Sequence, residues 1–373
     1  MNRPPLRFAF VLPGLHAVSR GAETALEALG AEIGRRPDAR VTLFGRGQAR
    51  EKSPYDFVTV PARPREKYQS WPRLPGLRSP EAWEDLSFSR QLKEKYNVEA
   101  FDVTVTCNYP WSHWTIQRRT RSRHGHVHLF VTENGDWPAF SDDWEFRFFH
   151  CDGLVCTNPV YHERNRERWP SALIPNGFDP ERFHPGPGDP ATIGMDPDLP
   201  LVLMVSALTD HKRVREGMAA VATMDEPLQL LVAGDGPLRS EVEALGERRF
   251  GDRFACRRFD HTQMGNVYRC ADVLLHPCLD EPSAHVYVEA MASGLPVITH
   301  DHPTTRWTLG ERDHLVDARQ TEAMADALGT ALAGAEKMPD GEFEKICERF
   351  AWRRLADRYV EFARQRLECG PPV

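Results

Sequence analysis

Two glutamates separated by seven residues, Glu281 and Glu289, are the side chains of this sequence best placed to do chemistry. They lie in the segment 277–299, which reads PCLDEPSAHVYVEAMASGLPVIT. Most residues around Glu289 are small or apolar, so we expect its carboxylate on a largely buried helix. A buried carboxylate is costly unless hydrogen-bond donors meet it, and sugar hydroxyls are donors that arrive in pairs. The two glutamates therefore predict a site for sugar hydroxyls.

The start of the same helix offers a place for an anion. Ser283 can cap a helix that ends at Gly294, ahead of a β-branched strand. Backbone N–H groups in a first helical turn lack a partner within the helix and can face a phosphate. Those groups belong to Ala284, His285 and Val286. Two carboxylates that accept hydroxyl groups, with an anion site between them, would suit the sugar, diphosphate and ribose of a nucleoside diphosphate sugar. The alternative is that both glutamates are ordinary helix residues without a ligand.

The elements that position this segment alternate between apolar runs and helical stretches. Buried strands are expected at 7–12, 41–45, 101–106, 128–132, 153–158, 201–206, 228–234 and 272–277. The first helix is expected over 22–36. This alternation is typical of α/β proteins with parallel sheets, whose ligands bind beyond the carboxyl ends of the strands.

A Pro- and Gly-rich stretch, 186–198, divides the alternation into two halves. We expect two doubly wound Rossmann-like domains, an N-terminal one over 1–190 and a second over 199–349. The last stretch, 350–373, contains an amphipathic helix. Two such domains facing each other form an interdomain cleft, which is a favoured place for ligands.

Two segments of the first half suggest further contacts. Residues 60–90 are rich in Pro, Arg and Trp and predict a long irregular insertion, in which Trp71, Trp83 and the arginines form either an acceptor surface or a solvated lid. A basic cluster follows later, and either ends a helix in solvent or meets an anionic lipid head group. It consists of Arg118, Arg119, Arg121 and Arg123.

Composition narrows the classes of partner. The net charge of −7 and the pI near 6.1 give no general attraction to nucleic acid. The eight cysteines include no CxxC pair and favour reduced thiols in the cytoplasm. No window reaches the roughly 20 apolar residues of a membrane span, so we expect a cytoplasmic protein, with peripheral contact at the inner face of the membrane as an alternative.

Several motifs resemble those of a known family. The Glu pair followed by AMASGLPVI, the stretch IPNGFD at 174–179 and RGAE at 20–23 are similar to motifs of retaining glycosyltransferases of family 4, which have the GT-B fold. The resemblance implies transfer of a hexosyl group from a nucleoside diphosphate sugar, such as a UDP- or GDP-sugar, to a hydroxyl acceptor. It also implies that the final helix returns to the first domain.

The resemblance assigns roles in the donor site. Glu281 would hold the donor sugar and Lys212 the diphosphate as catalytic residues, while Glu289 would hold the ribose. Without a metal motif, positive charge must stabilise the departing diphosphate, and Lys212 opens a helix beside the first strand of the second domain. The other donor-binding candidates are Gly14, Arg213, Arg258, Phe259, Ala284, His285 and Val286.

Acceptor hydroxyls are assigned to the first domain. Polar residues at a strand end in the segment TENGDWP would face the cleft of a GT-B protein. These residues are Glu133, Asn134 and Asp136. The acceptor itself, a small molecule, glycan or lipid-linked sugar, is left open.

The sequence also departs from the family pattern. Ala207 stands where the family usually has an Arg, five residues before Lys212, and Ser283 and Ala284 replace Phe and Gly. An Asp196–Asp198 pair lies in the Pro- and Gly-rich linker and is not interpreted as a metal motif. No metal or other cofactor is expected. Two alternatives remain, a GT-B epimerase of UDP-sugars and a nucleotide-sugar-binding protein without transfer activity.

Overall fold

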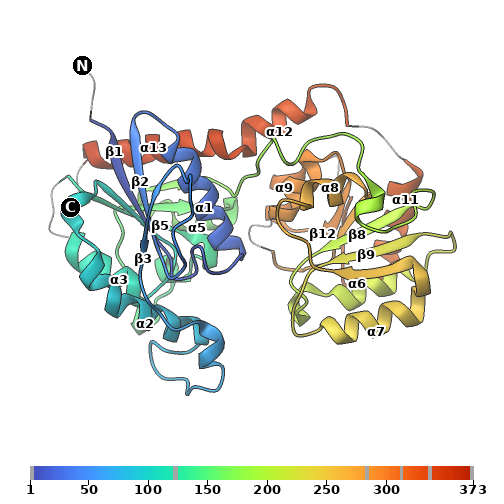
Figure 1. The fold of residues 1–373 in the computed structure, drawn as a ribbon, viewed down its shortest axis with the longest axis horizontal. Coiled ribbons are helices and arrows are strands. Elements are labelled where there is room, and N and C mark those ends of the chain that lie inside the picture. The colour runs from blue at the N-terminus through green and yellow to red at the C-terminus, as the bar shows by residue number, and fades with distance from the viewer. Residues whose placement is uncertain (1–3, 121–124, 282–284, 311–313, 335–337, 370–373) are drawn as a thin grey trace. The chain divides into compact units, whose positions relative to one another are not determined.

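The computed structural model describes residues 4–120, 125–281, 285–310, 314–334 and 338–369, and the chain divides into two compact units (Figure 1). Unit 1 joins the chain up to Asn176 to the stretch from Trp352 onward. Unit 2 runs from Gly177 to Ala351. Each unit is a parallel sheet with helices on both faces, so the expected pair of Rossmann-like α/β domains is confirmed.

Unit 1 is built on a sheet of the order β3-β2-β1-β4-β5-β6-β7, in which every pairing is parallel. Its strands are β1 Leu6–Val11, β2 Ala39–Gly45, β3 Asp56–Thr59, β4 Val103–Thr106, β5 Val127–Val131, β6 Gly153–Cys156 and β7 Ser171–Leu173. Its helices are α1 Gly21–Gly34, α2 Pro80–Lys95, α3 Trp111–Thr120, α4 Trp137–Phe140, α5 Pro159–Asn165 and α13 Trp352–Cys369.

The apolar run of β1 explains its position in the interior of that sheet. Phe8 and Phe10 face the core formed with α1 and α13, whereas Ala9 and Val11 face the core formed with α2 and α3. A strand that is buried on both faces needs apolar residues at every position, which accounts for the unbroken run in the sequence.

Unit 2 repeats the plan with the order β10-β9-β8-β11-β12-β13, again entirely parallel. Its strands are β8 Leu201–Val205, β9 Gln229–Ala233, β10 Phe254–Arg257, β11 Val273–His276, β12 Val297–His300 and β13 His314–Val316. Its helices are α6 Val214–Val221, α7 Arg239–Phe250, α8 Met264–Arg269, α9 His285–Ala292, α10 Pro303–Leu309, α11 Thr321–Ala333 and α12 Glu342–Phe350. Helices α8, α9 and α12 contribute to one core, and α6, α7 and α11 to the other.

The division between the units falls earlier than the Pro- and Gly-rich stretch suggested. Phe178, Phe183 and Ile193 are buried in the core of unit 2, and Phe178 pairs with Ala351 in an isolated parallel bridge. Residues that we expected to close the first domain or to form a linker therefore pack as part of the second. The Pro- and Gly-rich composition indicated a linker, but a few large apolar side chains bury this irregular stretch in the core of unit 2.

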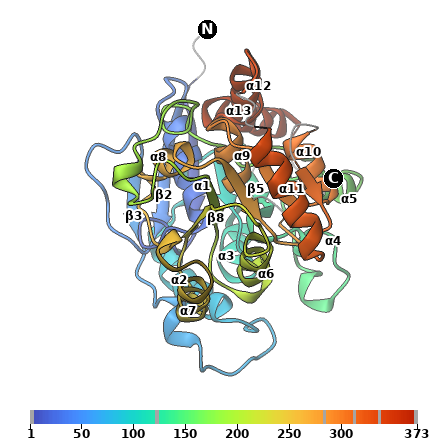
Figure 2. The same ribbon diagram turned by 90° about the vertical axis from the view of Figure 1, so that its right-hand side faces the viewer.

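The expected irregular insertion over 60–90 is partly wrong, because α2 begins at Pro80. Ser79 caps this helix by accepting a hydrogen bond from the backbone N–H of Ala82 at 3.3 Å, and proline is favoured in a first helical turn. Before it, the chain is irregular apart from a short 3₁₀ helix, Arg65–Tyr68. This light-blue segment extends away from the sheet of unit 1 in both views (Figures 1 and 2).

Two further expectations concern the chain as a whole. Among the described helices, none is long and apolar enough to cross a bilayer. All eight cysteines lie in the described part of the chain and are free thiols, and three of them are buried in unit 1.

Candidate functional site

An ion pair between Lys212 and Glu281 lies at the carboxyl edge of the sheet in unit 2. Lys212 ends a short 3₁₀ helix that follows β8, and Glu281 follows β11, the neighbouring strand. The Lys212 ammonium donates a hydrogen bond to Glu281 Oε2. The fold thus joins two residues that are 69 positions apart in the sequence.

His276, the last residue of β11, completes this group. Its Nε2 lies 3.4 Å from Glu281 Oε2, and its ring packs edge-on against Tyr287 of α9. Burial of Glu281 opposes its ionisation, but the hydrogen bond from His276 and the charge of Lys212 outweigh burial and lower its pKa to about 2. Glu281 is therefore an ionised acceptor beside a cation, which suits a sugar hydroxyl next to a phosphate.

Glu289 lies on α9 in a different environment. It is buried, and the hydroxyl of Tyr268 donates a hydrogen bond to its Oε2 at 2.9 Å. Burial raises the pKa of Glu289 to about 7, against the opposing effects of the Tyr268 hydrogen bond and the Arg182 charge. Its Oε1 has no hydrogen-bond partner in the described part of the chain, so this atom can accept a hydroxyl from a ligand.

The two basic candidates near this site have different surroundings. The Arg213 guanidinium donates a hydrogen bond to the carbonyl of Ala318 at 3.2 Å and forms an ion pair with Glu216 at 3.3 Å. Arg213, which we expected to assist Lys212 in binding the diphosphate, is therefore already paired within the protein. Arg258 is exposed just beyond β10. Phe259, next to it, packs against the core of unit 2, which leaves only part of its ring accessible.

The start of α9 is described from His285 onward. His285 and Val286 are the first two residues of the helix, and the Val286 side chain packs against the core of unit 2. Ser283 and Ala284, which were expected to cap the helix and to contribute an N–H group, lie outside the described residues. The predicted anion site is therefore represented by His285 and Val286 alone.

Gly14 lies in close contact with the first helix of unit 1. A Cβ atom on Gly14 would lie 1.9 Å from Oε1 of Glu23, so any larger residue at this position would force the Glu23 side chain to move. Glu23 is buried, and burial raises the pKa of its carboxyl group. The loop after β1 is thus held against RGAE, the sequence that starts α1.

The three candidates for binding the acceptor differ in how many of their polar atoms remain available to a ligand. Glu133 accepts a hydrogen bond from the Asn176 amide at 3.0 Å, and burial raises its pKa to about 7. Asn134 is exposed and donates to Asn108 at 2.7 Å. Asp136 is buried, and its carboxylate already accepts hydrogen bonds from other side chains. Glu133 and Asn134 are the members of this set with capacity left for a ligand.

The Asp136 carboxylate is held by two side chains of α5. Arg164 Nε donates to Asp136 Oδ2 at 2.9 Å, and the Asn165 amide donates to the same oxygen at 2.7 Å. A buried carboxylate with these partners anchors α5 to the loop before α4, and this favours a structural role over the predicted contact with an acceptor.

One group of described side chains has the composition of a metal site. One potential ligand atom from each of His276, Cys278 and Glu281 lies within 4.8 Å of the others. Lys212 competes with a metal ion for Glu281, because its ammonium group already donates to that carboxylate. In the linker, Asp196 accepts the backbone N–H of Asp198 at 3.0 Å, which is a turn contact.

Sequence reasoning missed His276 and Tyr268. His276 had a signal, because it is a polar residue at the carboxyl end of an apolar strand, five positions before Glu281. Tyr268 had none, since it lies 21 positions from Glu289 and meets it only through the packing of α8 on α9.

Residues 189–340 match the family model described as Glycosyl transferases group 1. The matched stretch contains Lys212, Glu281 and Glu289, around which the site of unit 2 is built.

Curated relatives are similar to part of the chain. Alpha-maltose-1-phosphate synthase of Mycolicibacterium smegmatis is 25% identical over 217 residues, covering 52% of this chain and 56% of the relative. D-inositol 3-phosphate glycosyltransferase of Rhodococcus opacus is 29% identical over 208 residues, covering 51% of this chain and 46% of the relative. The chain thus spans about half the length of these curated relatives.

Solved structures resemble the chain over nearly its full length. Sucrose-phosphate synthase from Thermosynechococcus elongatus has a TM-score of 0.78 at 22% identity, covering 98% of this chain and 100% of the other. Anabaena HepE, solved in complex with UDP and glucose, has a TM-score of 0.71 at 14% identity, covering 95% and 98%. The fold is therefore the GT-B fold of glycosyltransferases.

Proposed function

We propose that this protein transfers a hexosyl group from a nucleoside diphosphate sugar to a hydroxyl acceptor, with retention of anomeric configuration and without a metal ion. The observation that carries the proposal is the Lys212–Glu281 pair, which lies at the carboxyl edge of the sheet within the stretch that matches the glycosyltransferase model. A cation and an ionised acceptor on one edge suit the diphosphate and the sugar hydroxyls of such a donor.

Each side chain then has a defined task. Lys212 neutralises the charge that develops on the departing diphosphate, while Glu281 accepts hydroxyl groups of the donor sugar. Glu289 accepts the ribose hydroxyls through its Oε1. The bond from the anomeric carbon to the phosphate oxygen breaks, and the acceptor oxygen attacks from the same face. The acceptor proton passes to the leaving phosphate, which accounts for retention without a protein nucleophile.

Similar proteins support this assignment. The relatives are named as sugar transferases or synthases, and one structural neighbour was solved with UDP and glucose. We propose a UDP- or GDP-hexose as the donor, and a small-molecule, glycan or lipid-linked hydroxyl as the acceptor. Function in carbohydrate biosynthesis in the cytoplasm, in the manner of family 4, follows from the same proposal.

Donor hydrolysis tests the proposal without knowledge of the acceptor. The protein is incubated with a panel of UDP- and GDP-hexoses, and released nucleotide and sugar are measured. Lys212→Ala should lower the rate at least about 100-fold, as expected when a group that stabilises the transition state is lost. Lys345→Ala is the matched control, because Lys345 is an exposed lysine of unit 2 whose partner is Glu342.

Metal independence is tested in the same assay. Turnover should survive excess EDTA, since Lys212 supplies the positive charge. Loss of turnover with rescue by a divalent cation would contradict this part of the proposal and would direct attention to His276 and Cys278. An altered sugar recovered in the nucleotide would instead identify an epimerase, and binding of donor without any turnover would identify a binding protein.

A further inference from the structure

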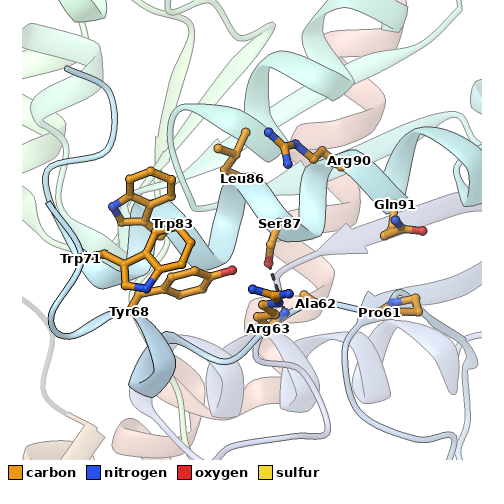
Figure 3. Close-up of a pocket in the computed structure, with 10 residues that line it drawn as sticks. All are labelled: Pro61, Ala62, Arg63, Tyr68, Trp71, Trp83, Leu86, Ser87, Arg90 and Gln91. Atoms are coloured by element: carbon orange, nitrogen blue, oxygen red, sulfur yellow. Dashed lines mark hydrogen bonds between the residues drawn. The ribbon is translucent and has the colours of Figure 1, made fainter. Parts of the chain in front are cut away.

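Unit 1 contains a cavity of about 540 Å³ between the chain that follows β3 and helix α2 (Figure 3). Its walls combine aromatic side chains from the irregular segment with polar and basic side chains. The lining residues used below are Arg63, Tyr68, Trp71, Trp83, Ser87 and Arg90. None of them belongs to the site described above.

Three aromatic rings form one wall. Trp71 meets Tyr68 and Trp83 edge-on, with ring centroids 4.9 and 4.8 Å apart, and Tyr68 and Trp83 lie nearly parallel at 6.1 Å. Trp71 remains 42% exposed although it contacts both other rings. In Figure 3 the Tyr68 hydroxyl points toward the side lined by Arg63 and Ser87. The wall thus offers an apolar face with a polar group at its edge.

Polar contacts fix the wall before any ligand arrives. Trp83 Nε1 donates to the carbonyl of Pro72 at 3.2 Å, and the backbone N–H of Arg63 donates to Ser87 Oγ at 3.2 Å. Two ion pairs hold the 3₁₀ helix of this segment, Arg20–Glu66 at 2.8 Å and Arg65–Glu81 at 3.1 Å. A pocket with fixed walls loses less conformational entropy when it binds a ligand.

The charge of the cavity is positive. Arg63 and Arg90 line it, and neither guanidinium has a hydrogen-bond or ion-pair partner in the part of the chain that the structure describes. The cavity lining includes no carboxylate. Arg90 also lines a second cavity of about 260 Å³ on α2, together with Lys93 and Arg118. Unpaired arginines beside an aromatic wall suit an anion attached to an apolar surface.

We propose that this cavity is an acceptor subsite for a sugar ring that carries an anionic group, either a phosphate or a carboxylate; this inference rests on the proposed transferase function. The C–H face of the sugar packs on the exposed ring of Trp71, and the anion pairs with Arg63 and Arg90. The cavity begins two residues after β3, at the carboxyl edge of the sheet, where parallel α/β sheets bind their ligands.

Calorimetry on the full chain tests the inference with four probes. These are glucose 6-phosphate, glucuronate, glucose and inorganic phosphate. One of the two acidic sugars should bind at least about tenfold more tightly than both glucose and phosphate, because only an acidic sugar uses the aromatic wall and the arginines together. The stronger of the two identifies the anion as phosphate or carboxylate. Binding of neither, or of glucose or phosphate equally well, would overturn the inference.

Variants connect the binding to this cavity. Arg63→Gln and Arg90→Gln should each weaken binding of the acidic sugar about tenfold, and Trp71→Ala about fivefold. Arg73→Gln and Trp144→Ala are matched controls, because both residues are exposed in unit 1 but do not line the cavity. Equal effects in variants and controls would contradict the assignment.

Donor hydrolysis separates this inference from the proposed function. It requires Lys212 but no acceptor, so the three cavity variants should hydrolyse the donor at the wild-type rate. Normal hydrolysis with unchanged binding of the acidic sugar would overturn the subsite and leave the transferase proposal intact. Absence of hydrolysis in the wild type would overturn the transferase proposal, while binding in the cavity would still be decided by calorimetry.

Discussion

The two glutamates of unit 2 show how environment gives one residue type two behaviours. The pKa of Glu281 falls to about 2, because His276 and Lys212 outweigh the cost of its burial. The pKa of Glu289 rises to about 7, because burial there exceeds the help from the Tyr268 hydroxyl and Arg182. Lys212 and His276 already stabilise an ionised Glu281, whereas an ionised Glu289 needs a further donor.

Glu289→Gln should therefore change stability and binding in opposite directions. Because burial raises the pKa of Glu289 from 4.5 to about 7, the folded protein keeps this proton at pH values where the unfolded chain has lost it. The contribution of Glu289 to stability is therefore present below about pH 4.5 and is lost as the pH rises through about 7. The glutamine variant should lack this loss, so at pH 8 it should gain up to about 3 kcal/mol in unfolding free energy relative to the wild type. Its nucleotide binding should weaken by about 1.5 to 3 kcal/mol.

Urea denaturation at pH 5 and pH 8, with calorimetry against UDP and GDP, measures both effects. Glu247→Gln is the control, since Glu247 is exposed on α7 and should alter neither quantity. Unchanged nucleotide affinity in the folded Glu289 variant would remove this residue from the donor site.

Ala207→Arg tests the departure from the family pattern. Ala207 is exposed between β8 and the 3₁₀ helix that ends at Lys212, and Arg213 is occupied by Glu216 and Ala318. A second cation here should tighten donor binding by about 1 to 3 kcal/mol, without a matching rise in turnover if donor and transition state gain equally. Calorimetry and steady-state kinetics measure the two quantities. Ala207→Gln lengthens the side chain without adding charge, so it should leave both donor affinity and turnover unchanged. Equal donor affinity of the arginine and glutamine variants would contradict the prediction.

At the scale of elements, the loops after the strands depend on a few close contacts. The loop after β1 approaches α1 at Gly14. The segment after β3 is held by ion pairs to Arg20, the residue before α1, and to α2. These contacts join loop to helix, so they keep binding groups at the carboxyl edge of the sheet. A change at one of them should move a loop and leave the sheet in place.

Gly14→Ala should destabilise unit 1 by about 1 to 3 kcal/mol, because its Cβ would lie 1.9 Å from Glu23 Oε1 and force the buried carboxylate to move. Gly21→Ala is the matched control: its Cβ would meet no atom within 4 Å, and Gly21 is the first residue of α1. The control should be neutral or slightly stabilising. Chemical denaturation measures both, and equal stabilities would show that the loop yields without cost.

At the scale of the whole molecule, the chain builds one unit from two separate stretches. Helix α13 follows unit 2 in the sequence, yet its residues Leu355, Tyr359 and Val360 are buried in the core of unit 1 with α1. This is the return of the final helix that the family resemblance implied. Unit 1 therefore needs the end of the chain to complete its core.

Leu355→Ala should destabilise unit 1 by about 2 to 5 kcal/mol, because Leu355 is fully buried and its removal leaves a cavity. Nucleotide affinity should stay unchanged, since Lys212, Glu281 and Glu289 lie in unit 2. Arg354→Ala, at the exposed neighbouring position of α13, should alter stability by less than about 0.5 kcal/mol. Denaturation and nucleotide calorimetry provide the two measurements. A loss of nucleotide affinity in the leucine variant would show that the units are coupled.

The sequence by itself determined most of the strands, the parallel sheets and the location of Glu281, Glu289 and Lys212 on loops or helices next to strand ends. It did not predict strands β3, β7, β10 and β13. These follow from local rules, since unbroken apolar runs specify buried strands and parallel pairing places strand ends on one edge. Composition was a poorer guide to boundaries, as the early start of α2 and of unit 2 shows.

Only the tertiary structure decided which side chains meet. Lys212 and Glu281 pair across 69 positions, and Tyr268 reaches Glu289 across 21. By contrast, the sequence predicted that Asp136 and Arg213 would contact ligands, but in the structure Asp136 binds Arg164 and Arg213 pairs with Glu216. The physical reason is that such pairs depend on strand order, helix packing and side-chain direction, which are set by burial of the whole core and have no local sequence signal.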